Sequence, residues 1–215
     1  MAKKCVILSF GFDSSIVLTA YSKYNLESGD CIAFVIPNEK NARAESAIKS
    51  VESFLSNLKS RGVDINLKIL EVDANNIEKI ILKISDFILQ NDYVYYLEAT
   101  GGIRSICVAL TVSAILLKPK IASFSTINEA NGNIINVSLP YFNLVISGAK
   151  KEILNLLLSK GNATTKTIAT SIHKDISTVS RHLSELEESF IVEKDSKYDA
   201  DYKLTYVGYI VAKKV

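Results

Sequence analysis

Two short stretches of the chain combine glycines with side chains that can hold an anion. Residues 11–15 read GFDSS, and residues 98–104 read EATGGIR. Glycines let the backbone turn tightly or approach a ligand closely. An arginine such as Arg104 can bind a phosphate or a carboxylate through two hydrogen bonds. Taken alone, the second stretch fits an anion site and a tight turn with Arg104 in a surface ion pair equally well.

Each stretch is predicted to join a strand to a helix. The apolar run 5–10 and the aromatic and β-branched run 93–97 are typical of buried strands. A helix is expected to start at residue 16, with Asp13 or Ser14 as its N-cap, and an apolar helix is expected at 103–117. The free N–H groups and the dipole of a helix N-terminus attract anions, which is the physical basis of the anion-site alternative.

The surrounding pattern predicts an α/β fold. Further strands are expected at 31–36, 65–72, 121–126 and 134–137, with a turn at Asn131-Gly132, and further helices at 41–61 and 77–89. Strands that alternate with helices form a doubly wound, mostly parallel, Rossmann-like sheet. In such sheets ligands bind beyond the carboxyl ends of the strands where the connection order reverses. In the usual order the first and fourth strands are neighbours there, so we expect the two glycine loops to converge, and this convergence favours a ligand site.

The expected ligand site takes in both loops and the end of the second strand. The candidate ligand-binding residues are Phe10, Gly11, Phe12, Asp13, Ser14, Ser15, Pro37, Asn38, Glu98, Ala99, Thr100, Gly101, Gly102 and Arg104. The dinucleotide pattern G-x-G-x-x-G and the phosphate-binding pattern G-x-x-x-x-G-K-[ST] are both missing, which makes NAD and ATP poor candidates. Hydroxyls, backbone N–H groups and one arginine, with no magnesium cluster expected, suit phosphodiesters held without a metal.

The last third of the chain predicts a winged helix-turn-helix. Helices are expected at 149–161, 164–172 and 176–188, followed by a hairpin of strands 191–194 and 202–205. We place the domain boundary between residues 146 and 147. In this fold the third helix enters the DNA major groove and its N-terminal part contacts base edges. A winged helix that makes only protein contacts is the alternative.

Charge favours the DNA interpretation. Between residues 160 and 182, four basic residues stand against the single acid Asp175, while three glutamates follow at the far end of the third helix. His173 and His182 fit phosphate contacts or surface positions better than metal ligation. The candidate DNA-binding residues are Thr165, Lys166, Lys174, Ser177, Thr178, Ser180, Arg181 and Lys197.

Composition sets wider limits. The chain has 215 residues, of which 48% are hydrophobic and 22% charged, and its net charge is +2, which excludes a strongly basic arm. Cys5, Cys31 and Cys107 are odd in number and far apart, which argues against a disulfide framework or a zinc site and for a reducing compartment. No signal-peptide pattern and no apolar 20-residue run is present, so we expect a cytoplasmic protein with no membrane partner.

The two glycine loops and the third helix together resemble a known family. Residues 10–15 and the Gly-Gly-x-Arg element at 101–104 are similar to a CRISPR-associated Rossmann-fold (CARF) domain joined to a winged helix, as in archaeal type I-A CRISPR-associated transcription regulators. Residues 178–183 and 204–208 resemble winged helices of the multiple-antibiotic-resistance and arsenic types. At His173 those families often have glycine, which makes the geometry of this turn a point to examine.

The resemblance implies a ligand and an assembly. A homodimer would bind a cyclic oligoadenylate, with cyclic tetra-adenylate as the leading candidate, across its two-fold axis, and would bind a near-palindromic DNA operator. The apolar helix at 103–117 is the candidate subunit contact. No catalytic residue and no cofactor is expected. Two alternatives remain: cleavage of the cyclic ligand, with Ser14, Thr100 and Arg104 as candidates, and a regulator that senses another nucleotide.

Overall fold

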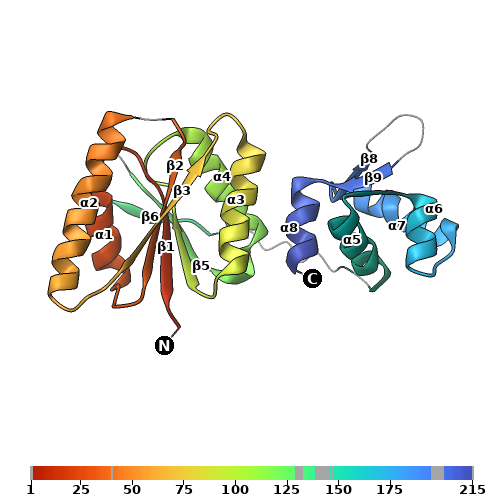
Figure 1. The fold of residues 1–215 in the computed structure, drawn as a ribbon, viewed down its shortest axis with the longest axis horizontal. Helices are drawn as coiled ribbons and strands as arrows, with labels where there is room; N and C mark the ends of the chain where they lie inside the picture. The colour runs from red at the N-terminus through yellow and green to blue at the C-terminus, as the bar shows by residue number, and fades with distance from the viewer. Residues whose placement is uncertain are drawn as a thin grey trace. The chain divides into compact units, whose positions relative to one another are not determined.

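The chain divides into two compact units. The computed structural model describes residues 2–39, 41–128, 133–138, 146, 148–194 and 201–214. The first unit is Met1–Phe142 and the second is Asn143–Val215 (Figure 1). The boundary expected between residues 146 and 147 falls close to this division. The predicted Asn131-Gly132 turn and Lys197 lie outside the described residues.

The first unit contains a six-stranded sheet with the order β3-β2-β1-β4-β5-β6. The first five strands in the chain run parallel, and β6 pairs antiparallel with β5. Strands β1 and β4 are direct neighbours, with Leu8 opposite Glu98, so the predicted doubly wound, mostly parallel sheet is confirmed. The strands are β1 Lys4–Ser9, β2 Cys31–Pro37, β3 Asn66–Val72, β4 Val94–Glu98, β5 Ile121–Ile127 and β6 Ile134–Asn136.

Helices cover both faces of this sheet. In Figure 1, α1 and α2 lie on one side of the strands, and α3 and α4 lie on the other. Helix α2 begins after Asn41, whose side chain accepts hydrogen bonds from two backbone N–H groups of the first turn. At α1 the N-cap position is Ser14, but the side chain that accepts a backbone N–H there is that of Asp13. The helices are α1 Ser15–Tyr24, α2 Ala42–Ser60, α3 Ile77–Gln90 and α4 Arg104–Leu116, and a short 3₁₀ turn at Lys118–Lys120 follows α4.

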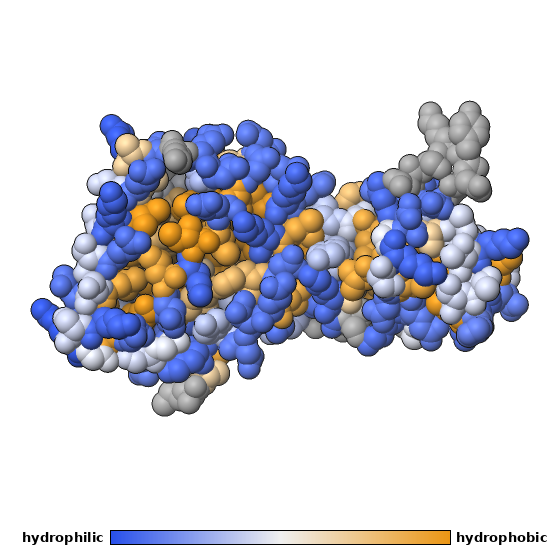
Figure 2. All heavy atoms as spheres, in the orientation of Figure 1, coloured by the Kyte–Doolittle hydropathy of each residue, from blue (hydrophilic) through white to orange (hydrophobic). Residues whose placement is uncertain are grey.

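The core of the first unit fixes the ends of the strands that carry the loops. Phe10, directly after β1, is buried and stacks on Phe34 of β2 with ring centroids 4.0 Å apart. Truncation of a buried phenylalanine to alanine typically costs about 3–5 kcal/mol. At the outer edge of the sheet, β3 exposes Lys68 and Glu71, charges that discourage pairing with another strand. Figure 2 shows apolar side chains between α2 and this edge of the sheet.

The second unit confirms the winged helix-turn-helix. Three helices precede a hairpin, and a three-stranded antiparallel sheet has the order β7-β9-β8. The three-residue strand β7 was not predicted, because it exists only through its pairing with β9, about 40 residues further along the chain. The elements are α5 Gly148–Lys160, β7 Asn162–Thr164, α6 Thr165–Ser171, α7 Ile176–Glu188, β8 Val192–Lys194, β9 Asp201–Leu204 and α8 Tyr206–Lys214.

Two expectations from the sequence concern the state of the cysteines and the possibility of a membrane span. The thiols of Cys5 and Cys31 are buried, that of Cys107 is half-buried, and all three are free. In the part of the chain that the structure describes, none of the helices combines the length and apolar character needed to cross a bilayer.

Candidate functional site

The two glycine loops of the first unit meet backbone to backbone. A Cβ atom built on Gly11 would lie 2.8 Å from the amide nitrogen of Gly102. A Cβ on Gly102 would lie 2.7 Å from the carbonyl oxygen of Phe10, and Gly102 has a left-handed φ of +75°. Only glycine fits such a close approach without displacing the neighbouring chain. The predicted convergence of the two loops is therefore confirmed, and it depends on both glycines.

The side chain of Ser9 holds the second loop against the first. Its buried hydroxyl oxygen accepts hydrogen bonds from the N–H groups of Thr100, at 3.1 Å, and Gly101, at 3.2 Å. The Sγ atom of Cys107, in the first turn of α4, lies 3.4 Å from the same hydroxyl. Two of the amides expected to face a ligand are thus already used inside the protein. Ser9 was not identified from the sequence as a loop-holding residue. The signal that could have found it is its position as a single polar residue at the end of an apolar strand, directly before the glycine loop.

Two hollows flank the joined loops. The larger has a volume of about 610 Å³, and the smaller, between the loops and the start of α2, has a volume of about 240 Å³. Nine of the fourteen predicted residues line one or both: Phe10, Gly11, Phe12, Asp13, Ser15, Pro37, Thr100, Gly101 and Gly102. The sequence analysis missed Ile16, Thr19, Ile127 and Asn128 in the larger hollow and Glu39, Asn41, Ala44 and Ile103 in the smaller.

Thr100, in the wall of the larger hollow, carries an unsatisfied polar group. The Oγ1 atom of Thr100 is buried and has no hydrogen-bond partner among the described residues. Buried hydroxyls in proteins are nearly always hydrogen-bonded, so the hydroxyl of Thr100 has an unused hydrogen-bonding capacity next to the hollow. Around it the hollow presents the side chains of Asp13, Ser15 and Thr19. The polar chemistry of this hollow suits a hydroxylated or phosphorylated ligand.

Five predicted residues lie outside the walls of the two hollows: Ser14, Asn38, Glu98, Ala99 and Arg104. Arg104 is the first residue of α4 and is exposed. It makes no ion pair with any residue in the described ranges, so the alternative of a structural surface ion pair finds no partner there. An exposed guanidinium at a helix N-terminus, next to Ile103 in the wall of the smaller hollow, remains available to an anion.

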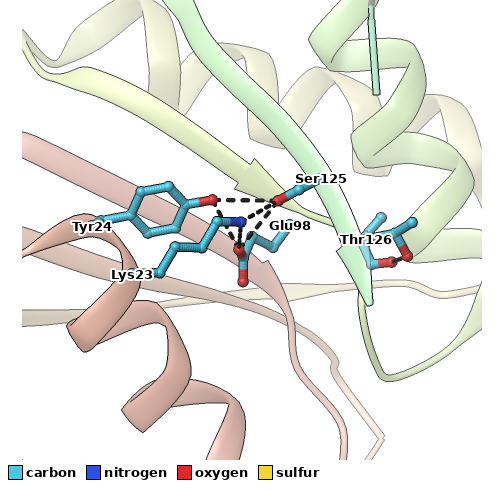
Figure 3. A network of polar contacts seen from close by, with 6 residues as sticks. Lys23, Tyr24, Glu98, Ser125 and Thr126 are labelled. Atoms are coloured by element: carbon cyan, nitrogen blue, oxygen red, sulfur yellow. Dashed lines mark hydrogen bonds and ion pairs between the residues drawn. The ribbon is translucent and has the colours of Figure 1, made fainter. Parts of the chain in front are cut away.

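Glu98 faces the interior of the unit and belongs to a polar network (Figure 3). Its carboxylate is fully buried, and the Oε1 atom accepts hydrogen bonds from Lys23 Nζ at 2.7 Å and from Tyr24 Oη at 2.8 Å. Ser125 Oγ lies 3.2 Å from the same oxygen. The network joins α1, β4 and β5 directly beneath the second loop. Glu98 therefore supports that loop from below.

The network also shifts the acidity of its members. Burial lowers the pKa of the Lys23 ammonium, but its hydrogen bonds to Glu98 and Tyr24 outweigh this effect and hold the pKa above its ordinary value. Burial raises the pKa of the Tyr24 hydroxyl. Next to the network, Thr126 Oγ1 donates a hydrogen bond to the carbonyl oxygen of Ala99 at 2.7 Å. These contacts keep Lys23 charged and position Ala99 at the base of the loop.

In the second unit, α7 has one buried face and one polar face. Val179, Leu183 and Leu186 are buried, as predicted. Among the predicted DNA-binding residues, Lys166, Lys174, Ser177, Ser180 and Arg181 are exposed, and Thr165 and Thr178 are half-buried. This arrangement leaves the polar side of α7 accessible, as the DNA interpretation requires.

The turn between α6 and α7 explains the departure at His173. This residue has a left-handed φ of 53°, and the N–H of Lys174 donates a hydrogen bond to the carbonyl of Ala169 at 3.1 Å. This bond pattern is a Schellman motif, in which glycine is the usual left-handed residue. His173 thus adopts the conformation that a glycine would adopt, and the turn geometry is preserved.

Charge is unevenly distributed over the second unit. Within the described part of the chain, Lys166, Lys174 and Arg181 make no ion pair. In contrast, Glu185 pairs with Lys150 at 2.8 Å, and the hydrogen bonds from Lys150 and His182 lower the pKa of its carboxyl. Glu187 pairs with Lys194 at 3.5 Å. The basic side chains Lys166, Lys174 and Arg181 are thus left unneutralised by described residues, while two of the three glutamates near the end of α7 are compensated.

Metal ligation was not expected from the sequence. In the residues that the structure describes, no group of three or more histidine, cysteine, aspartate or glutamate side chains is arranged to hold a metal ion. His182 lies 3.4 Å from Glu185. His173 lines an open hollow of about 750 Å³ where α6 meets α7.

Fold and site together define a Rossmann-like domain joined to a winged helix-turn-helix. Residues 4–138 match the family model described as the Csa3 CRISPR-associated Rossmann-like domain, and residues 147–189 match the model of a winged helix-turn-helix DNA-binding domain. The first match covers more than half of the chain. The chain therefore belongs to the Csa3 family of CRISPR-associated Rossmann-like proteins. A comparison with curated proteins found no match.

Several solved structures have a general likeness to this chain. Can2 from Sulfobacillus thermosulfidooxidans, in complex with cyclic tetra-adenylate, is 10% identical over 97% of this chain and 62% of its own, with a TM-score of 0.43. Enterococcus italicus Csm6, bound to cyclic hexa-2'-fluoro-hexa-dAMP, is 10% identical over 88% of this chain and 54% of its own, with a TM-score of 0.49. A mutant of Lactococcus lactis ZitR is 17% identical over 53% of this chain and 73% of its own, with a TM-score of 0.31. This chain spans less than two thirds of Can2 and Csm6, and with such low TM-scores none of these likenesses supports a functional argument.

Proposed function

We propose that this chain is a CRISPR-associated transcription regulator that binds a cyclic oligoadenylate at the two glycine loops and duplex DNA through α7. The observation that carries the ligand assignment is the joining of the Gly11 and Gly102 loops beside the unpartnered Thr100 hydroxyl. Cyclic tetra-adenylate is the leading ligand, as the family resemblance implies. It is a ring of phosphodiesters and ribose hydroxyls, which suits the hydroxyl groups of the larger hollow and the exposed guanidinium of Arg104.

Electrostatics support an anionic ligand at this edge of the sheet. The N-terminus of α4 carries a partial positive charge, and Arg104, the first residue of the helix, adds a full one. Hydrogen bonds to charged groups contribute about 1.5–3 kcal/mol each. One such contact therefore corresponds to roughly a tenfold to hundredfold gain in affinity.

We further propose that the protein acts as a homodimer. On the outward side of α4, Val108 is 49% exposed, and Val112 and Ile115 are half-buried. Phe12 and Ile103 add exposed apolar surface at the loops. A two-fold axis would present both loops twice to a ring of identical nucleotides. It would also pair two winged helices and favour a near-palindromic operator.

Regulation requires the ligand to distinguish two arrangements of the protein. A tenfold change in DNA affinity corresponds to a coupling free energy of about 1.4 kcal/mol. The phosphate contacts at the loops are strong enough to supply it. We propose that the protein is a sensor, so chromatography after incubation with cyclic tetra-adenylate should recover an intact ring. Linear products would instead support a ring-cleaving enzyme.

Calorimetry with an Arg104→Ala variant tests the ligand site. We expect the affinity for cyclic tetra-adenylate to fall at least about tenfold, because one charge-assisted contact is lost. The fold should be unchanged, because Arg104 is exposed and makes no ion pair within the described ranges. Arg61→Ala is the matched control, since Arg61 is an exposed arginine at the other end of α2 from the smaller hollow. Equal affinities for Arg104→Ala and wild type would overturn the site assignment.

A further inference from the structure

Ile176 is an exposed apolar residue among the polar residues at the start of α7. It is the first residue of α7 and is 55% exposed, whereas Val179, Leu183 and Leu186 of the same helix are buried to 1% exposure or less. Single exposed apolar side chains are common on proteins and are not informative by themselves. The position of Ile176 makes it informative, because the first turn of the third helix is the part of a helix-turn-helix that contacts bases.

The surroundings of Ile176 are polar and open. It lines the hollow of about 750 Å³ between α6 and α7, and its polar neighbours there include Lys174, Asp175, Ser177 and Thr178. These neighbours offer one ammonium, one carboxylate and two hydroxyls to a ligand. Ile176 is thus an apolar group set among hydrogen-bonding groups of both charges, and such a mixture can meet the edge of a base pair.

The charges nearby favour nucleic acid over a protein partner. Lys166, Lys174 and Arg181 are exposed and make no ion pair with other described residues. Two of the three glutamates of the same helix are instead compensated, since Glu185 pairs with Lys150 and Glu187 pairs with Lys194. Lys174 lines the same hollow as Ile176, and a phosphate contact from this unneutralised cation would hold the apolar side chain against the groove.

We propose that Ile176 recognises a thymine by contact with its C5 methyl group in the major groove. Thymine is the one standard DNA base that presents a methyl group there, and apolar side chains contact it. Ile176 would be a specificity-determining residue, beside the hydrogen-bonding contacts of Ser177 and Arg181. This inference rests on the proposed binding of duplex DNA through α7 and adds to it the identity of one base.

Replacement of thymine by uracil tests this contact without any change in base pairing. The probe is the tightest duplex that the full-length chain selects from a random-sequence pool. Each thymine in it is then replaced in turn by uracil, which lacks only the methyl group. Burial of one methyl group corresponds to about a fourfold change in affinity, so one thymine per half-site should show about this loss with the wild-type chain.

The same duplexes are then measured with variants. Ile176→Ala should bind the thymine and uracil duplexes equally at that position, and Ile176→Val, which keeps a branched apolar group, should retain most of the difference. Phe190→Ala is the matched control, because Phe190 is 56% exposed but follows the far end of α7, and it should retain the full difference. Circular dichroism establishes that each variant is folded.

The outcomes separate this inference from the proposed function. If Ile176→Ala keeps the wild-type sensitivity to uracil, or if no thymine replacement affects the wild-type chain, the methyl contact is refuted while DNA binding stands. If no duplex is enriched from the pool, the DNA-binding function and the inference both fail.

Discussion

The two candidate sites differ in what forms them: backbone contacts in the first unit and exposed side chains in the second. At the glycine loops of the first unit, the decisive feature is the lack of side chains: Gly11 and Gly102 let two backbones touch. At α7 of the second unit, the decisive feature is a row of exposed side chains on a helix whose other face is buried. Substitutions should therefore act differently at the two sites. At the loops they should disturb a shared shape, whereas on α7 they should remove separate contacts one by one.

The largest expected effect comes from Gly102→Ala. The new Cβ would meet the carbonyl oxygen of Phe10, and the left-handed φ of +75° disfavours any L side chain. We expect a loss of about 3 kcal/mol in the free energy of unfolding of the first unit, together with loss of cyclic tetra-adenylate binding. Urea denaturation and calorimetry measure the two effects.

Gly62→Ala is the matched control for this prediction. Gly62 also has a left-handed φ, of +89°, but a Cβ there would have no neighbour within 4 Å. This variant should lose only about 1 kcal/mol and bind ligand normally. Similar behaviour of the two variants would show that the contact between the loops is not essential, and the contrast between the two sites would fail.

The next effect in size concerns the network beneath the second loop. Glu98→Gln keeps the shape of the side chain but removes the charge opposite Lys23, and we expect a loss of about 2 kcal/mol in unfolding free energy. The double variant with Lys23→Met should lose less than the sum of the two single changes, because both act on one pair. The exposed pair Lys59–Asp64 provides the control, and Asp64→Asn should cost less than about 1 kcal/mol. A full additive loss in the double variant would show that the pair is not coupled.

Arg181→Ala tests the independence of contacts on α7. We expect DNA affinity to fall by about 1–3 kcal/mol with no change in stability, because Arg181 is exposed and contacts no described carboxylate. Combined with Lys166→Ala, the two losses should add. Binding to the selected duplex, measured at several salt concentrations, gives both numbers. Strong non-additivity, or unchanged affinity in Arg181→Ala, would contradict the picture of separate contacts.

The smallest effect is expected at the turn before α7. His173→Gly removes the cost of a left-handed conformation, and we expect the second unit to gain up to about 1 kcal/mol. Ser171→Gly, two residues earlier in helical conformation, should instead destabilise it by about 0.5–1 kcal/mol. Hydrogen exchange at the amides of α6 and α7 measures both changes. Destabilisation by His173→Gly would mean that the imidazole makes a contribution larger than its backbone strain.

The sequence predicted the parts of this molecule that depend on local pattern. Alternating apolar runs and helices placed β1 next to β4, and with them the two loops. The amphipathic pattern of α7 separated Val179 and Leu183 from the exposed Ser180 and Arg181. These features could be predicted because each one is repeated over several residues.

Features that depend on partners distant in the sequence could not be predicted in the same way. Lys23 and Glu98 are 75 positions apart in the chain, and the sequence around each residue contains no pattern that predicts their contact. The inward direction of Glu98 follows from β4 ending at residue 98, one residue later than predicted, since alternate residues of a strand share a face. The role of Ser9 similarly depends on amides 91 and 92 residues away.

The hydroxyl of Ser9 has a consequence for the timing of ligand binding. In the folded chain this hydroxyl accepts hydrogen bonds from two amides of the second loop. Without it, an incoming phosphate would have to order these amides. The loop is thus preorganised, because the conformational entropy of the loop is lost when the chain folds and not when the ligand binds. The association rate constant of the ligand should then be high, because the loop changes little on binding. In Ser9→Ala this rate constant should fall, because the loop must become ordered each time a ligand binds.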